Sequence, residues 1–235
     1  MSEIRIYQHG RNTATNYAAQ ELKRIGYTFC NDEDTESATH ILLNIPSVSD
    51  ETMEMRDNIT YIGGNLKLPK TINTIDLLND PQYLATNAMI TAHCAIKIAM
   101  NQLPYILNNC RVLIIGWGRI GKCLAQVLRQ IGCIVTVAAR KSKDRTILTA
   151  LGYHTVDIVE INFNMYEVVY NTAPVLLFEN CDADTLVIDL ASTPGITGPN
   201  VVIARGLPGK EAPASSGRLI ASTVHRILSN KEVSE

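Results

Sequence analysis

Residues 111–121 read Arg-Val-Leu-Ile-Ile-Gly-Trp-Gly-Arg-Ile-Gly, and this stretch decides the fold. Its first five residues form a short apolar run, which is typical of a strand buried on both faces. A glycine-rich turn follows, and apolar residues then recur at intervals of three and four through residue 131, as in an amphipathic helix. A second apolar run, Cys133 to Ala138, predicts another strand. In this order of strand, turn, helix and strand, a GxGxxG pattern indicates a dinucleotide-binding fold.

Each glycine of the turn has a predicted physical role. Gly116 allows the tight turn, Gly118 lets the main chain approach a pyrophosphate, and Gly121 lets the helix pack closely on the strand. We expect the pyrophosphate at the helix N-terminus, where free N–H groups and the helix dipole favour an anion. The predicted cofactor-binding residues of the turn are Gly116, Trp117, Gly118, Arg119, Ile120 and Gly121. Glycines also end ordinary strand–helix turns, so a purely structural role is the alternative.

The end of the second strand predicts which dinucleotide is bound. NAD-binding folds usually carry Asp or Glu there, which accepts hydrogen bonds from the ribose 2′-hydroxyl. Here Ala138 and Ala139 occupy that region, and Arg140, Lys141 and Ser142 follow. These three donors can bind a 2′-phosphate, and no carboxylate repels it. We therefore expect NADP(H) rather than NAD(H), the alternative being that this segment is only a solvated loop.

The composition and the residue patterns give no indication of several classes of function. The chain has 235 residues, is 46% hydrophobic and carries a formal net charge of −2, which gives no indication of a nucleic-acid or membrane partner. No apolar run approaches the length of a membrane span, and the first residues do not resemble a signal peptide. The six cysteines have neither CxxC pairs nor the spacing of metal ligands. We expect a cytoplasmic protein without a metal site.

The alternation of predicted elements indicates an α/β protein with a Rossmann-type doubly wound parallel sheet and a smaller N-terminal α/β domain. We expect the small domain over residues 1–80, an inter-domain helix over 81–104 and the NAD(P)-binding domain over 105–235. The predicted inter-domain helix has almost no charge before Lys97, so we expect it to be buried nearly all round. His93 lies within it, where a structural role is the alternative to a catalytic one.

Polar loops follow the later strands of the predicted Rossmann domain. In such a sheet the ligand lies outside the carboxyl ends of the strands, so we expect these loops to face the nicotinamide and its reaction partner. They begin at Asn171, Ala191 and Gly206. We expect Thr172, Ala173 and Pro174 to contact the cofactor. The same residues are also ordinary turn formers, which leaves a structural reading open.

The glycine turn and these loops together resemble the A-subunit family of dipicolinate synthase. The resemblance is carried by Gly116-Trp-Gly-Arg-Ile-Gly121, Ala138-Ala-Arg-Lys-Ser142, Asn171-Thr-Ala-Pro174, Asp189-Leu-Ala-Ser192 and Gly206-Leu-Pro-Gly209. It covers residues 105 to about 229 well and the first hundred residues poorly. It implies an oxidoreductase that oxidises dihydro- or hydroxytetrahydrodipicolinate to dipicolinate in sporulation, together with a flavoprotein B-subunit. Residues 85–89 depart from the family's corresponding stretch, because they lack its acid.

A cyclic dicarboxylate substrate requires cations or amide donors for its carboxylates, and a base that takes a proton as hydride leaves. The predicted catalytic residues are His93 as proton carrier, Asn171 for positioning, Ser192 as a hydroxyl donor and Lys210 as a carboxylate partner. Arg205 is an alternative carboxylate partner.

Three functions are compatible with the sequence. The first is the NADP-dependent dipicolinate synthase-like enzyme, which we expect to be a homo-oligomer. The second is another dehydrogenase of 2-hydroxyacid dehydrogenase-like architecture. The third is a non-catalytic, nucleotide-binding subunit that regulates a partner.

Overall fold

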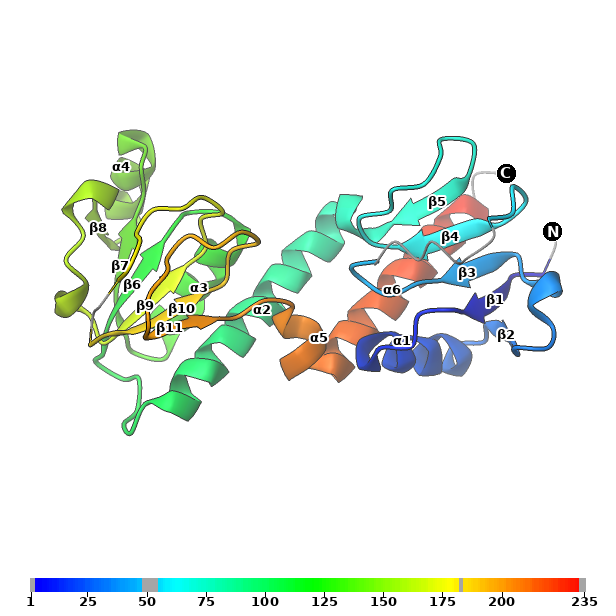
Figure 1. The fold of residues 1–235 in the computed structure, drawn as a ribbon, viewed down its shortest axis with the longest axis horizontal. Coiled ribbons are helices and arrows are strands. Elements are labelled where there is room, and N and C mark those ends of the chain that lie inside the picture. The colour runs from blue at the N-terminus through cyan, green and yellow to red at the C-terminus, as the bar shows by residue number, and fades with distance from the viewer. Residues whose placement is uncertain (1–2, 48–54, 182–183, 233–235) are drawn as a thin grey trace. The chain divides into compact units, whose positions relative to one another are not determined.

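The computed structural model of the chain describes residues 3–47, 55–181 and 184–232. The chain forms two compact units, which are coloured by residue number in Figure 1. The first unit combines Met1–Asn87 with Pro208–Glu235, and the second contains Ala88–Leu207. Helix α2 (Pro81–Gln102) is continuous in the chain from the first unit into the second. The predicted helix start is confirmed, since the Asp80 carboxylate accepts a hydrogen bond from the Tyr83 N–H at 2.7 Å.

The first unit contains a parallel five-stranded sheet with the order β2-β1-β3-β4-β5. Its strands are β1 (Arg5–Gln8), β2 (Thr28–Cys30), β3 (His40–Leu42), β4 (Thr60–Gly63) and β5 (Asn73–Asp76). The expected small α/β domain is therefore present. Strand β5 was not expected, because its sequence Asn-Thr-Ile-Asp contains a single apolar residue. Such a polar edge strand gives no periodic signal.

Helix α6 (Pro213–Glu232) packs against α1 (Thr13–Arg24) in this unit. A Cβ atom at Gly217 would lie 2.4 Å from Cβ of Tyr17 and 2.7 Å from the carbonyl oxygen of Ala14, so glycine is what permits this close approach. This division differs from the predicted boundaries, which assigned all of 105–235 to the dinucleotide domain. The physical reason is the contact between α1 and α6, which joins the two ends of the chain.

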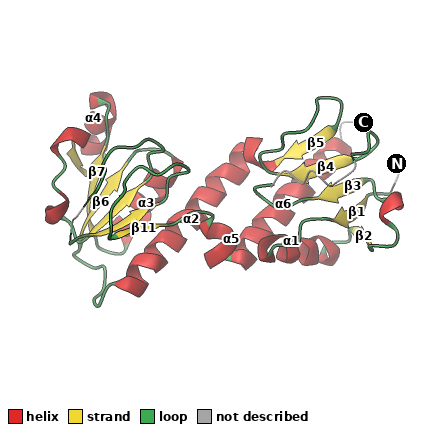
Figure 2. Ribbon diagram, in the orientation of Figure 1, coloured by secondary structure: helices red, strands yellow, loops and turns green. Residues whose placement is uncertain are grey.

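The second unit contains a parallel six-stranded sheet with the order β11-β10-β9-β6-β7-β8. Read from β8, this is the 3-2-1-4-5-6 order of a Rossmann fold, and the predicted fold class is confirmed. Helices accompany the strands, as Figure 2 shows. The elements are β6 (Arg111–Ile115), α3 (Arg119–Gln130), β7 (Ile134–Ala138), α4 (Ser142–Ala150), β8 (His154–Val156), β9 (Val168–Asn171), β10 (Leu186–Asp189) and β11 (Val201–Ile203).

The apolar strand sequences follow from burial on both faces. Residues 112–115 of β6 are 0% exposed, as are 168–171 of β9, and these two strands are neighbours at the centre of the sheet. The chain leaves β6 toward one edge of the sheet and later continues from β9 toward the other. Their carboxyl ends therefore form the topological switch point, where doubly wound sheets bind their ligands.

Candidate functional site

The glycine turn lies at the switch point, directly after β6. Gly116 has φ +103°, and its N–H donates to the carbonyl of Ala138 at 2.9 Å. A Cβ atom at Gly116 would lie 2.6 Å from Oγ1 of Thr172 and 3.4 Å from the Ala173 nitrogen. Both the left-handed φ and the lack of space explain why the position is glycine.

The other two glycines have opposite surroundings. A Cβ atom at Gly121 would lie 2.3 Å from the carbonyl oxygen of Gly116, so this glycine brings α3 close to the end of β6. No described atom lies within 4 Å of a Cβ built at Gly118. Gly118 is the N-cap of α3 and contributes no side-chain hydrogen bond to the first N–H groups of the helix. The space above Gly118 and these uncapped N–H groups fit a pyrophosphate, as the sequence predicts.

Trp117, within the turn, contacts neighbouring side chains. Its ring centroid is 5.9 Å from that of Tyr153 in an edge-on arrangement, and Nζ of Lys122 is 5.8 Å from the indole centroid. The indole is half-buried. Trp117 is the single tryptophan of the chain, so its fluorescence reports on this turn alone.

The segment after β7 is exposed. Ala138 and Ala139 are buried, whereas Arg140, Lys141 and Ser142 are all exposed. Lys141 is the N-cap of α4, and no side chain caps that helix. The three predicted phosphate donors therefore lie at the N-terminus of a nine-residue helix. The N–H groups of its first turn and the charges of Arg140 and Lys141 favour an anion there.

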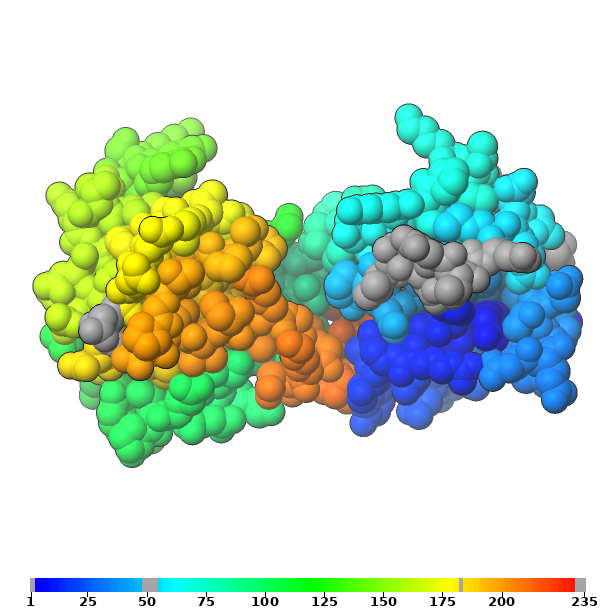
Figure 3. Space-filling view, viewed as in Figure 1, coloured from blue at the N-terminus to red at the C-terminus, as the bar shows by residue number. Residues whose placement is uncertain are grey.

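The loop after β9 is tied to the glycine turn. The hydroxyl and the N–H of Thr172 each donate to the carbonyl of Ile115 at 2.9 Å. The structure thus brings Thr172 and Ala173 together with Gly116, as expected of cofactor-binding residues. Pro174 follows them and is exposed. Figure 3 shows the loops after β9 and β10, coloured yellow to orange, on the surface of this unit.

Asn171 has a different environment from the one we expected. Its side chain is 0% exposed, donates from Nδ2 to the carbonyl of Ala173 at 3.2 Å and accepts from the Ala173 N–H at 3.1 Å. The side chain shapes the loop and is not available to a substrate. The structure gives Asn171 a part in fixing Ala173, and its predicted positioning role in catalysis stays a prediction.

Asp189, at the end of β10, was not predicted as a site residue. It is 0% exposed, and its carboxylate accepts hydrogen bonds from the N–H groups of Ala191 at 2.9 Å, Gly195 at 2.7 Å and Ile196 at 3.0 Å. This carboxylate fixes the loop that carries Ser192. An acid placed directly after a buried apolar strand, with glycine six residues later, is the sequence signal for such a role.

The remaining predicted catalytic residues lie in different units of the chain. Ser192 is exposed on the loop after β10, and Lys210 is exposed but belongs to the first unit. Nε of Arg205 donates to the carbonyl of Ala191 at 3.0 Å, while its buried Nη2 has no hydrogen-bond partner among the described residues. The Arg205 side chain is therefore held beside the loop that carries Ser192, and its Nη2 makes no hydrogen bond to a described residue. The catalytic roles of Ser192 and Lys210 stay predictions.

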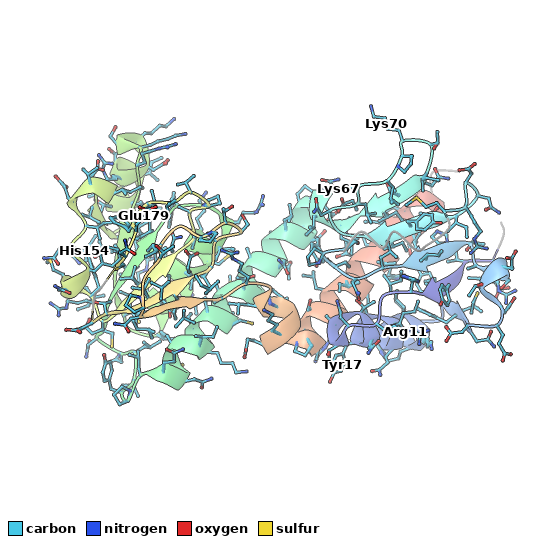
Figure 4. All side chains as sticks on the ribbon, in the orientation of Figure 1. Arg11, Tyr17, Lys67, Lys70, His154 and Glu179 are labelled. Carbon is cyan, nitrogen blue, oxygen red and sulfur yellow. The ribbon has the colours of Figure 1, made fainter. Side chains whose placement is uncertain are left out.

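His93 is exposed on α2, and so is Met100, so the expectation that this helix is buried nearly all round is wrong. The burial that singled out His93 is absent, and its role as proton carrier stays a prediction. The other histidine of the second unit, His154 (labelled in Figure 4), begins β8 and lies at the amino edge of the sheet, opposite the glycine turn.

The thiol of Cys123, in α3, is partly buried. Burial raises the pKa of Cys123, so the thiol stays protonated at neutral pH. The described residues contain no group of three or more His, Cys, Asp or Glu side chains that could hold a metal ion. Within those same ranges, no helix is both long and apolar enough to cross a membrane.

Comparison with known proteins supports the resemblance seen in the sequence. The chain is 28% identical to the dipicolinate synthase A-subunit of Bacillus subtilis (strain 168) over 165 residues, which cover 63% of this chain and 55% of that protein. The resemblance is confirmed. The aligned segment thus spans only about half the length of the curated relative. No protein-family model matches the chain.

Solved structures show the same fold. The crystal structure of the dipicolinate synthase A-subunit from Bacillus halodurans matches with a TM-score of 0.80 and 21% identity, over 96% of this chain and 97% of that one. A transhydrogenase from Sinorhizobium meliloti matches with a TM-score of 0.70 and 12% identity, over 97% and 94%. Further matches include a D-lactate dehydrogenase from Escherichia coli and an L-alanine dehydrogenase, each 11% identical to this chain, and they share its fold.

Proposed function

We propose that the chain is an NADP-dependent oxidoreductase of dipicolinate synthase type. One observation carries the dinucleotide part of the proposal. An uncapped helix N-terminus, an open position above Gly118 and a glycine with left-handed φ coincide at the switch point of a Rossmann sheet. The preference for NADP is supported by Arg140, Lys141 and Ser142, which are exposed at the start of α4 beside the buried Ala138 and Ala139.

The proposed reaction is the oxidation of dihydro- or hydroxytetrahydrodipicolinate to dipicolinate. The chemistry that NADP⁺ supplies when bound is acceptance of one hydride from the substrate, while a proton is released to a base or to water; the hydroxytetrahydro substrate also eliminates one molecule of water. The loops after β9 and β10 lie at the edge where the nicotinamide is expected. Arg205, which follows β11, is held against the loop after β10 through its hydrogen bond to the Ala191 carbonyl, and its buried Nη2 has no hydrogen-bond partner among the described residues. We therefore propose it as a partner for a substrate carboxylate. Ser192 is proposed as a second donor, and Lys210 and His93 as a carboxylate partner and a proton carrier from outside these loops.

The test is a pair of titrations with NADPH and NADH. Replacing both Arg140 and Lys141 with Ala removes two charges that face the 2′-phosphate but not the rest of the dinucleotide. We expect NADPH affinity to fall roughly 10- to 100-fold while NADH affinity changes by less than about threefold. Equal losses for both nucleotides would contradict the NADP assignment.

The curated relative is named as one subunit of its enzyme, which supports the proposal that a flavoprotein B-subunit is the partner of this chain. We also propose that the chain forms a homo-oligomer and is located in the cytoplasm. Turnover of dihydrodipicolinate should therefore be measured with and without that partner. Turnover in either assay supports the proposal that the chain is a catalytic oxidoreductase.

A non-catalytic regulatory subunit is the second candidate. It is favoured by the limited alignment, which leaves almost half of the curated relative unmatched. This function predicts normal NADPH binding with no oxidation of dihydrodipicolinate, even when the flavoprotein partner is supplied.

A further inference from the structure

Arg145, in the first turn of α4, contacts the main chain at the end of β7. Its Nη1 donates to the carbonyl of Ala139 at 2.6 Å and to the carbonyl of Arg140 at 3.1 Å. The Arg145 side chain is 24% exposed, so it is partly shielded from water. This guanidinium therefore fixes the two peptide groups that lead into the Arg140-Lys141-Ser142 segment.

The same guanidinium also holds a carboxylate. Nη1 of Arg145 lies 2.8 Å from Oδ2 of Asp157, whose side chain is 30% exposed. Asp157 directly follows β8, and Ala138 pairs with Val156 in the adjoining strands, so Asp157 stands beside Ala139 at the carboxyl edge. Its other oxygen accepts from the Val159 N–H at 3.4 Å.

This arrangement places a carboxylate beside the position that commonly distinguishes the two dinucleotides. An acid at the end of the second strand accepts hydrogen bonds from the 2′-hydroxyl of NAD, and its charge repels the 2′-phosphate of NADP. Here Ala139 replaces that acid, while Asp157 arrives from the neighbouring strand. The pair that Asp157 forms with Arg145 has no net charge, so the carboxylate repels a nearby anion less than it would alone.

We propose that the Arg145–Asp157 pair determines the cofactor preference of this chain. The proposal rests on the proposed NADP-dependent function and adds to it two residues outside the exposed basic segment. Arg145 neutralises Asp157 and holds the main chain that carries Arg140 and Lys141, so that the segment attracts a 2′-phosphate. Without Arg145, the freed carboxylate repels the phosphate and can accept a hydrogen bond from a 2′-hydroxyl. Arg145 is thus a positioning and specificity-determining residue.

The test is a double-mutant cycle of Arg145→Ala, Asp157→Asn and both together, with Kd for NADPH and NADH measured by calorimetry. Arg145→Ala should weaken NADPH about tenfold and leave NADH unchanged or slightly tighter. Asp157→Asn alone should keep NADPH affinity within about threefold of the wild type, and the double variant should recover the part of the Arg145→Ala loss that comes from the unpaired carboxylate. The probes 2′,5′-ADP and 5′-AMP should repeat this pattern, which assigns the effect to the 2′-phosphate.

The matched control is Arg111→Ala, because Arg111 forms a comparable pair with Glu167 at 3.2 Å at the amino end of β6. It should change neither affinity. Equal loss of NADPH and NADH in Arg145→Ala, or failure of the double variant to recover, overturns the proposal and leaves Arg145 a structural residue. The wild-type titrations distinguish failure of this inference from failure of the proposed function. If the wild type shows no preference for NADPH, the proposed NADP dependence is refuted, and the role of the Arg145–Asp157 pair with it.

Discussion

Gly118 offers a way to separate the binding role of the glycine turn from its structural role. Its backbone lies at φ −82° and ψ −168°, a conformation that alanine adopts freely, and nothing lies within 4 Å of the added Cβ. Gly118→Ala should therefore fold at least as well as the wild type. A gain of about 0.4–1 kcal/mol is expected from the smaller entropy of the unfolded chain.

Nucleotide binding should respond in the opposite direction. The new methyl group occupies the space proposed for the pyrophosphate, beside the first N–H groups of α3. Losing one hydrogen bond to a charged group costs about 1.5–3 kcal/mol. That range corresponds to a loss of affinity of roughly 10- to 150-fold, for NADPH and NADH alike, because both carry the pyrophosphate.

The assay combines urea unfolding with calorimetric titration of both nucleotides. Gly26→Ala is the matched control, because its Cβ also meets nothing within 4 Å but its φ is +108°. It should lose about 1–2 kcal/mol of stability and no affinity. If Gly118→Ala binds both nucleotides as tightly as the wild type, the pyrophosphate does not lie at this turn and the reasoning is refuted.

Two further predictions concern stability. Asp189→Asn should lower the free energy of unfolding by about 2–3 kcal/mol, because three buried N–H groups share its carboxylate; unchanged urea denaturation would contradict this. A hydrogen bond from Arg226 lowers the pKa of Asp80, so the stability it contributes is present above the ordinary pKa and is lost as pH falls through the lowered value. Asp80→Asn should therefore cost about 1 kcal/mol at neutral pH and less near pH 3, and an equal cost at both would refute the linkage.

The second unit was predictable because its signals are local. Strands buried on both faces must be apolar, so β6, β7, β9 and β10 are visible as short runs of branched side chains. Gly26, Gly132 and Gly152 each follow the end of a helix with positive φ, a local signal that the sequence carries as glycine.

The division of the chain was not predictable in this way. The contact of α6 with α1 joins residues about two hundred positions apart. The sequence near Gly217 does not indicate which helix packs against it. The polar strand β5 and the five-residue helix α5 (Leu207–Glu211) are too short or too polar to give a periodic signal.

The site residues also divide into those that local sequence predicts and those that depend on contacts between distant residues. Gly116 and Gly121 were predictable because each meets a steric condition that the motif itself encodes. The contacts of Asn171 were not predictable, because a polar residue at the end of a strand can face either the ligand or its own loop, and only the three-dimensional structure shows that it bonds to Ala173. The Arg145–Asp157 pair was missed because it joins two strand ends through a helix.

The most direct test of the central claim uses the intrinsic fluorescence of Trp117, titrated in parallel with NADPH and NADH. Trp117 lies inside the glycine turn, and its emission overlaps the absorption of reduced nicotinamide. A dinucleotide bound at the turn predicts a saturable quench, at lower concentration for NADPH than for NADH. The absence of a quench with both nucleotides would contradict the assignment of this turn as the binding site.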